Sequence, residues 1–181
     1  HLDSLSDFVV FGAVPAFAVY LWMDKPQGNF FWIIIVLYVI CSALRLARFN
    51  SELSERPNYA KNYFTGVPTP AAAFLMLFPI AIDEFLTSYN LKSFDVIALW
   101  IGFISVAMVS NLPTFSGKVF QIPKSFVIPL LIILAILSNA IISNPIKGFI
   151  ILVCVYLISI PFASIFYLRL KKKAEALNLK T

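Results

Sequence analysis

Residues 30–46 of the sequence read FFWIIIVLYVICSALRL, an apolar run whose only charged residue, Arg45, stands near its end. A helix needs about 20 mainly apolar residues, within a range of about 17–25, to cross the hydrocarbon core of a bilayer. Similar runs recur along the chain, and 60% of its 181 residues are hydrophobic while only 13% are charged. A soluble domain carries about 25% charged residues. The sequence therefore predicts an all-α membrane protein.

The apolar runs predict a polytopic helical bundle that forms a single transmembrane domain over residues 1–181. Pro68 and Pro70 open one of the runs, where early-turn prolines cost little. Pro15, Pro79, Pro129 and Pro161 lie inside or near the ends of other runs, where they are expected to kink the helices. The six predicted spans cover residues 5–22, 30–46, 67–82, 96–109, 126–142 and 146–168.

The basic residues gather on one side of this predicted bundle. Lys25, Lys92 and Lys147 fall on the other side, and the remaining eleven of the fourteen Lys and Arg residues fall on the first. The positive-inside rule makes the first side cytoplasmic, and six spans then alternate without conflict. Basic residues at the ends of apolar runs indicate that the partner is anionic lipid and not nucleic acid. Residues 169–181 form a basic tail that is predicted to lie on the cytoplasmic side. The eleven are Arg45, Arg48, Arg56, Lys61, Lys118, Lys124, Arg169, Lys171, Lys172, Lys173 and Lys180.

Two carboxylates, Asp3 and Asp7, stand four residues apart before the first apolar run. On a helix these positions lie one above the other, about 5–6 Å apart at Cβ, so the two charges repel unless a cation lies between them. Oxygen ligands of this kind suit a hard divalent cation. Solvated acids at a helix N-terminus, which the helix dipole favours, would show the same spacing. The spacing leaves both interpretations open.

Two arginines, Arg45 and Arg48, stand three residues apart at the cytoplasmic end of the second predicted span, and Asn50 follows them. Residues three apart share a helix face. Arginine binds phosphate through paired hydrogen bonds, which makes the pair a candidate anion site. The alternative is that both side chains extend to the lipid headgroups without binding a substrate.

Two polar connectors are weaker candidates for shaping a pocket on the same side. Gly66 permits an unusual backbone angle, and the prolines that follow it stiffen the start of the third span. Ser110 and Asn111 open a polar loop after the fourth span. A structural turn and a plain connector are the alternatives for these two segments.

Taken together, these residues resemble the CDP-alcohol phosphatidyltransferase superfamily, whose motif contains D-x-x-D-G-x-x-A-R followed by G-x-x-x-D-x-x-x-D. The opening HLDSLSD is similar to the end of this motif, with Asp3 and Asp7 as its third and fourth aspartates. Within the superfamily, the integral-membrane phosphatidylserine synthases of bacteria are the most similar branch. The similarity covers roughly residues 1–125 in order and rests on residues 7–16, 43–50, 63–73 and 108–111.

The resemblance also implies that part of the motif would lie before His1. The family fold typically has eight spans, so six spans imply an N-terminally truncated chain. Such a chain should not complete the metal site alone, which leaves the activity of the fragment itself an open question.

The resemblance implies transfer of a phosphatidyl group from CDP-diacylglycerol to L-serine, giving phosphatidylserine and CMP, in the cytoplasmic (inner) membrane of a bacterium with the active site facing the cytoplasm. It implies a divalent cofactor, Mg²⁺ or Mn²⁺, with Asp3 as a ligand and Asp7 as ligand and catalytic base. It allows a homodimer. The expected substrate-binding residues are Arg45, Arg48, Asn50, Gly66, Ser110 and Asn111.

Other functions remain open at this point. The acceptor could be glycerol phosphate or inositol phosphate, although the segments at 45–50 and 63–70 favour serine by resemblance. A non-catalytic membrane protein, either a transporter or a degenerate fragment, is the alternative from another class. A transporter more often places ionisable residues at the bilayer midplane, and the predicted spans are nearly free of charge there.

Overall fold

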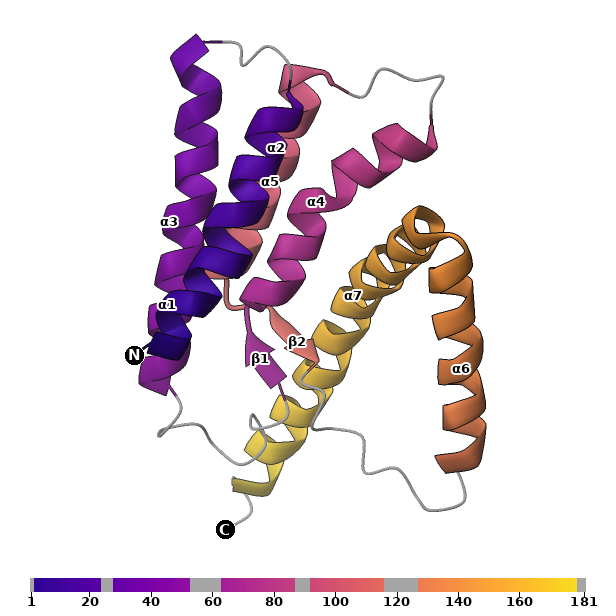
Figure 1. Cartoon of the computed structure of the whole chain (residues 1–181). Helices are drawn as coiled ribbons and strands as arrows, with labels where there is room; N and C mark the ends of the chain where they lie inside the picture. Colours follow the sequence, from indigo (N-terminus) through magenta and orange to yellow (C-terminus); the bar gives the residue numbers. More distant parts are fainter. Residues whose placement is uncertain (1, 24–27, 53–62, 87–91, 116–126, 179–181) are drawn as a thin grey trace.

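A computed structural model describes residues 2–23, 28–52, 63–86, 92–115 and 127–178 of the chain (Figure 1). The first segment is one continuous helical rod made of α1, a π-helical turn η1, and α2. The elements in chain order are α1 (Leu2–Phe8), η1 (Val9–Ala13), α2 (Val14–Trp22), α3 (Gly28–Glu52), β1 (Tyr63–Thr65), α4 (Thr69–Phe85), α5 (Phe94–Val109), β2 (Pro113–Phe115), α6 (Val127–Ser143) and α7 (Pro145–Asn178).

Helices occupy all six predicted spans, which confirms the all-α membrane class. Three of them are long and apolar enough to cross a membrane, namely Leu2–Trp22, Phe30–Ser51 and Pro145–Arg169, and Phe94–Val109 is a shorter apolar helix. The helix α3 runs six residues beyond the predicted end at 46, and α7 continues through most of the predicted basic tail. The rest of that tail and the connectors that carry Lys25, Arg56, Lys61, Lys118 and Lys124 lie outside the described residues.

One end of the molecule collects the segments that the charge pattern places on the cytoplasmic side. Figure 1 shows the start of α1, the end of α3, the start of α4, the end of α5 and the end of α7 at this end, together with both strands. We call it the strand end. This arrangement agrees with the alternation of spans predicted from the basic residues.

The buried core lies among α2, α3, α4 and α5, and the outer helix faces are also apolar. Phe31, Tyr38, Met76 and Ile104 are fully buried in this core. Large side chains such as Phe17 and Leu99 are at the same time more than half exposed. Exposure of these outer faces to water would cost free energy, whereas contact with the hydrocarbon of lipid tails would not. The surface therefore fits a bilayer.

Two three-residue strands were not predicted. They pair antiparallel at the strand end, with Phe64 opposite Thr114. Gly66 follows β1 with φ of +79°, a backbone angle that favours glycine. This confirms the unusual backbone angle expected at this residue.

The Gly66–Val67 turn has all four of its backbone polar groups hydrogen-bonded. Gly66 N donates to Leu112 O at 2.7 Å, and Val67 N donates to Ala107 O at 3.2 Å. Gly66 O accepts from Thr114 Oγ1 at 2.9 Å, and Val67 O accepts from Arg45 Nε at 3.3 Å. The turn therefore joins α3, the end of α5 and β2 at the point where α4 begins.

Two prolines inside the bundle each leave a backbone carbonyl without its helical donor, and an aromatic side chain donates a hydrogen bond to that carbonyl instead. Proline has no N–H, so the carbonyl four residues earlier loses its helical donor. For Pro15 that carbonyl belongs to Phe11, and it accepts from Tyr38 Oη on α3 at 3.0 Å. An unsatisfied backbone group inside a bilayer would cost several kcal/mol, roughly, so this hydrogen bond also fixes α3 against the first rod.

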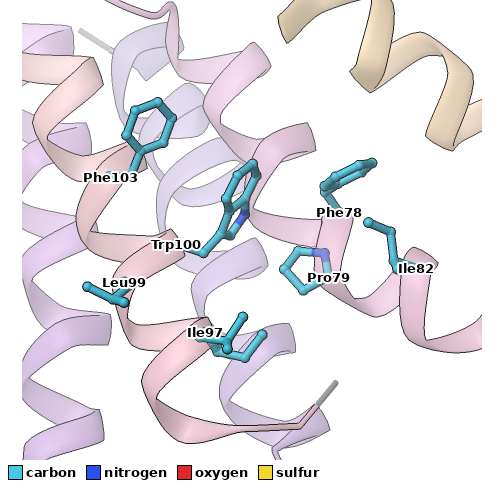
Figure 2. Close-up of a pocket in the computed structure, with 8 residues that line it drawn as sticks. Phe78, Pro79, Ile82, Ile97, Leu99, Trp100 and Phe103 are labelled. Atoms are coloured by element: carbon cyan, nitrogen blue, oxygen red, sulfur yellow. The ribbon is translucent and has the colours of Figure 1, made fainter. Parts of the chain in front are cut away.

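The second proline lies in α4. Pro79 leaves the Leu75 carbonyl, which accepts from Trp100 Nε1 on α5 at 2.9 Å. Figure 2 shows Trp100 reaching from α5 toward α4 beside Pro79. Beyond this hydrogen bond the two helices line an open apolar cavity of about 540 Å³, with side chains such as Ile82, Ile97 and Phe103 on its wall. This cavity lies in the second half of α4, away from the strand end.

We expect Gly66→Ala to lower the free energy of unfolding by at least about 2 kcal/mol. A left-handed backbone costs a residue with Cβ about 1–2 kcal/mol, and the added Cβ would come within 2.5 Å of Met108 O. Thermal unfolding in detergent measures the change. Gly102→Ala is the matched control, because a Cβ there meets nothing within 4 Å and alanine favours a helix by about 1 kcal/mol. Equal melting temperatures for G66A and G102A would contradict the role of the turn.

We expect Trp100→Phe to destabilise the protein by about 1–3 kcal/mol, because the Leu75 carbonyl loses its side-chain donor. In a Pro79→Ala background the backbone N–H of residue 79 returns and can bond this carbonyl, so the same substitution should cost less. A double-mutant cycle followed by thermal unfolding measures the difference. Trp100→Phe removes the same ring volume in both backgrounds. If it destabilised the protein equally in both, the indole N–H would not be replacing the backbone donor that Pro79 lacks.

Candidate functional site

A second cavity, of about 450 Å³, opens at the strand end between the first rod, α3 and the start of α4. Its wall contains one acid, one arginine and otherwise apolar or weakly polar side chains. The lining residues are Asp7, Phe11, Arg45, Leu46, Phe49, Pro68, Thr69, Pro70, Ala71 and Phe74. Of the predicted site residues, the structure brings Asp7 and Arg45 to this wall.

Asp7 is half-buried and lies in the last turn of α1, directly before the π-helical turn. The wider turn is closed by Val14 N–H donating to Val9 O. Single π-turns within helices are frequent at functional sites. Gly12 lies in this turn against α3, where a Cβ would come within 2.7 Å of Ser42 Oγ. The close approach of the two helices lets a side chain from α3 share a wall with Asp7.

Arg45 supplies the positive charge of the cavity wall. Its side chain is only 3% exposed, and its Nε donates to Val67 O, which orients the guanidinium group. The first turn of α4 lies beside it, since Thr69 and Ala71 also line the cavity. A helix N-terminus carries a partial positive charge. Arg45 and the start of α4 therefore favour an anionic group in this part of the cavity.

Arg48 serves a different part of the structure from Arg45. Its Nη1 donates to Val109 O at 3.3 Å and its Nη2 donates to Asn111 Oδ1 at 2.7 Å. Ser110 Oγ donates to Ala107 O at 2.8 Å at the same helix end. Cationic and hydroxyl groups placed in this way satisfy the last carbonyls of a helix. The structure thus places Arg48, Ser110 and Asn111 at the end of α5 and outside the cavity lining.

The other predicted site residues lie around the cavity and not on its wall. Asp3 is exposed on α1, one helical turn before Asp7. Asn50 Nδ2 donates to Ser4 Oγ at 3.1 Å, which ties the end of α3 to α1. Gly66 is buried in the turn that leads into the lining residues Pro68 and Thr69. Within the described residues no three His, Cys, Asp or Glu side chains form a cluster that could hold a metal ion.

The apolar part of the wall was not predicted. Phe11, Leu46 and Phe74 line the cavity, but their surroundings in the sequence are equally apolar, and no local pattern separates them from lipid-facing residues. Pro68, Thr69 and Pro70, which also line the cavity, belong to or border the turn at 66–70 that was a weaker candidate for shaping a pocket. Phe49 lies in the segment at 43–50 that carries part of the family resemblance. Chemically, the cavity suits a molecule that joins an anionic group to an apolar part.

The comparisons with known proteins agree with this chemistry. The family model described as CDP-alcohol phosphatidyltransferase matches residues 1–110. This stretch contains Asp7, Arg45 and every other residue that lines the cavity.

Curated relatives carry one shared name, CDP-diacylglycerol--serine O-phosphatidyltransferase. The protein of this name from Mycobacterium bovis is 32% identical over 90% of this chain and 57% of its own length. That from Helicobacter pylori is 35% identical over 62% of this chain and 46% of its own, and that from Methanocaldococcus jannaschii is 32% identical over 66% and 52%. The chain thus spans about half the length of these relatives. Because the family model covers more than half of it, the chain belongs to the CDP-alcohol phosphatidyltransferase family.

Proposed function

We propose that this chain carries the acceptor and base side of an enzyme that transfers a phosphatidyl group from CDP-diacylglycerol to L-serine. The observation that carries the proposal is the cavity in which the Asp7 carboxylate and the buried Arg45 guanidinium share one wall. Family membership supports the reaction class, and the shared name of the relatives supports serine as the acceptor. Phosphatidylserine and CMP are the products of the proposed reaction.

Asp7 is the proposed general base. A serine hydroxyl is a weak nucleophile at neutral pH and needs an adjacent group that takes its proton. In the proposed step the serine oxygen forms a bond to the phosphorus that carries diacylglycerol, and the hydroxyl proton moves to the Asp7 carboxylate. The bond from this phosphorus to the CMP oxygen breaks, and its electron pair leaves with CMP. Asp7 is half-buried on the cavity wall, which suits a base that must contact both water-soluble and lipid substrates.

Arg45 is the proposed anion-binding residue. Its planar guanidinium group can form two parallel hydrogen bonds with a carboxylate or a phosphate. The hydrogen bond from Nε to Val67 O holds this plane against the cavity, so a bound anion meets a donor whose orientation is already set.

The carboxylates of α1 can supply part of the ligands that a divalent cation, Mg²⁺ or Mn²⁺, needs. Asp3 and Asp7 lie on one face of α1, and Mg²⁺ is commonly bound by one or two carboxylates together with substrate phosphates and water. Asp3 and Asp7 are therefore the residues that would hold it. When bound, the cation would neutralise the pyrophosphate and stabilise the departing CMP.

The proposed site opens at a membrane boundary. The strand end holds the cavity and also the side to which the sequence assigns most of the basic residues, so we propose that the cavity faces the cytoplasm from a bacterial inner membrane. One substrate arrives from the bilayer and the other from water. A cavity with apolar walls and two charged residues at this boundary is accessible to both.

We expect Asp7→Asn to lower the turnover number by about 10²–10⁴-fold, which is the usual contribution of a general base. Binding of CDP-diacylglycerol should change much less. Incorporation of labelled serine into lipid is measured in membranes that contain the complete reading frame encoding this chain. Asp95→Asn is the matched control, because Asp95 is an exposed acid in the first turn of α5. The first turn of α5 lies at the end of this helix that is farther from the strand end and its cavity (Figure 1). Normal turnover in D7N would contradict the role of the base, and incorporation of glycerol phosphate or inositol phosphate instead of serine would contradict the acceptor.

The two arginines should respond differently to substitution by lysine. Arg45→Lys keeps the charge but removes the planar pair of donors, so we expect the KM of the substrate bound there to rise about tenfold, equivalent to about 1.4 kcal/mol. Arg48→Lys should leave both KM values within about twofold and lower the melting temperature, because Arg48 bonds the end of α5. Steady-state kinetics with serine and CDP-diacylglycerol varied in turn measure the difference. Equal KM changes in R45K and R48K would contradict the assignment of Arg45 alone to the cavity.

A further inference from the structure

The ring of Tyr156 on α7 is partly buried and packs against the hydrophobic core, but its hydroxyl group makes no hydrogen bond within the described part of the fold. The Tyr156 hydroxyl oxygen is buried and has no hydrogen-bond partner among the residues that the structure describes. Leaving a buried hydroxyl unpaired costs about 1–3 kcal/mol. A phenylalanine would fill the same space without this cost. The hydroxyl therefore calls for a partner that is bound only during function.

The position of Tyr156 relates it to the cavity of Asp7 and Arg45. Tyr156 lines a small space of about 60 Å³ between α7 and α4. Ala71 and Phe74 line this space and also line the larger cavity, so the two spaces share a wall. Arg45 lines the larger cavity on one side of this shared wall, and Tyr156 lines the smaller space on the other side.

Phe74 is the residue of the shared wall that also contacts α7. The Phe74 side chain is 45% exposed, and its ring meets Phe149 of α7 at a centroid distance of 5.8 Å. The inference below requires the Phe74 ring to turn to another staggered rotamer so that the two spaces join. The hydroxyl of Tyr156 would then face the same volume as the guanidinium of Arg45.

We propose that the Tyr156 hydroxyl donates a hydrogen bond to an anionic oxygen of the substrate that Arg45 binds, so that α7 completes the anion-binding side of the cavity. This inference rests on the proposed function and deepens it. The oxygen belongs either to the serine carboxylate or to a phosphate of CDP-diacylglycerol. The family model ends at residue 110, so this contribution comes from a part of the chain beyond the matched stretch.

The test is Tyr156→Phe in the complete reading frame, assayed with L-serine and with CDP-diacylglycerol in mixed micelles. Loss of a hydrogen bond to a charged group raises the KM of one substrate about tenfold. A rise confined to serine identifies the carboxylate, and a rise confined to CDP-diacylglycerol identifies the phosphate. The same substrate should raise the melting temperature of Y156F less than that of the wild type, since ligand stabilisation follows affinity.

The melting temperature without substrate separates this inference from a structural role. Because the hydroxyl has no internal partner to lose, Y156F without substrate should unfold at the wild-type temperature or above it. Tyr20→Phe is the matched control, because it removes a phenol oxygen from an aromatic cluster between α2 and α3 and keeps the ring contacts with Phe31 and Trp32. It should change neither KM.

Two results would overturn the inference. One is a Y156F enzyme with both KM values and both substrate-induced melting shifts unchanged, and the other is a lower melting temperature of Y156F without substrate. Failure of the proposed function would look different, because the wild-type enzyme itself would then incorporate no serine into lipid.

Discussion

The turn at Gly66–Val67 is the constraint on which the strand end of this protein depends. Its backbone groups bond to α3 through Arg45, to the end of α5 through Ala107, and to the segment of β2 through Leu112 and Thr114. Only a residue without Cβ fits there, because the backbone angle is left-handed and two carbonyl oxygens lie within 2.8 Å of where a Cβ would stand. The start of α4 follows directly, so the turn decides where one wall of the candidate site lies.

Inside a bilayer, every backbone polar group of the bundle also has to be hydrogen-bonded within the protein, because no water is available to bond an unpaired carbonyl. Pro15 and Pro79 each remove a helical hydrogen bond, and in both cases an aromatic donor on a neighbouring helix bonds to the freed carbonyl. These hydrogen bonds have a positional consequence, since Tyr38 fixes α3 against the rod that carries Asp7. The distance between the Asp7 and Arg45 backbones thus depends on a hydrogen bond made well inside the membrane-spanning part.

The proposed chemistry needs opposite charges close together where lipid meets water. A carboxylate and a guanidinium group on separate helices can share a wall only if the helices approach closely, and Gly12 against Ser42 permits this approach. The remaining wall is apolar, which suits the lipid part of an activated phospholipid. The long helix α7 packs against α4 and β2, and its Tyr156 lines a small space that shares Ala71 and Phe74 with the cavity.

Much of this was predictable from the sequence, because it depends on local properties of the chain. Hydrophobic runs of sufficient length place all six helices, and the asymmetry of Lys and Arg predicts which helix ends lie together. The pattern at Asp3 and Asp7 and the arginines at the end of α3 predicted the residues that the structure places at or near the cavity. The left-handed angle at Gly66 was likewise expected from the residue type.

The tertiary structure decided which of these residues meet. Arg45 and Arg48 are three residues apart and equivalent in sequence, yet one lines the cavity and the other bonds the end of α5. The strand pair, the apolar wall and the neighbourhood of Tyr156 depend on contacts between residues far apart in the chain. A sequence read locally carries no signal for such contacts, because in a membrane protein the residues that face the core and those that face lipid have the same apolar character.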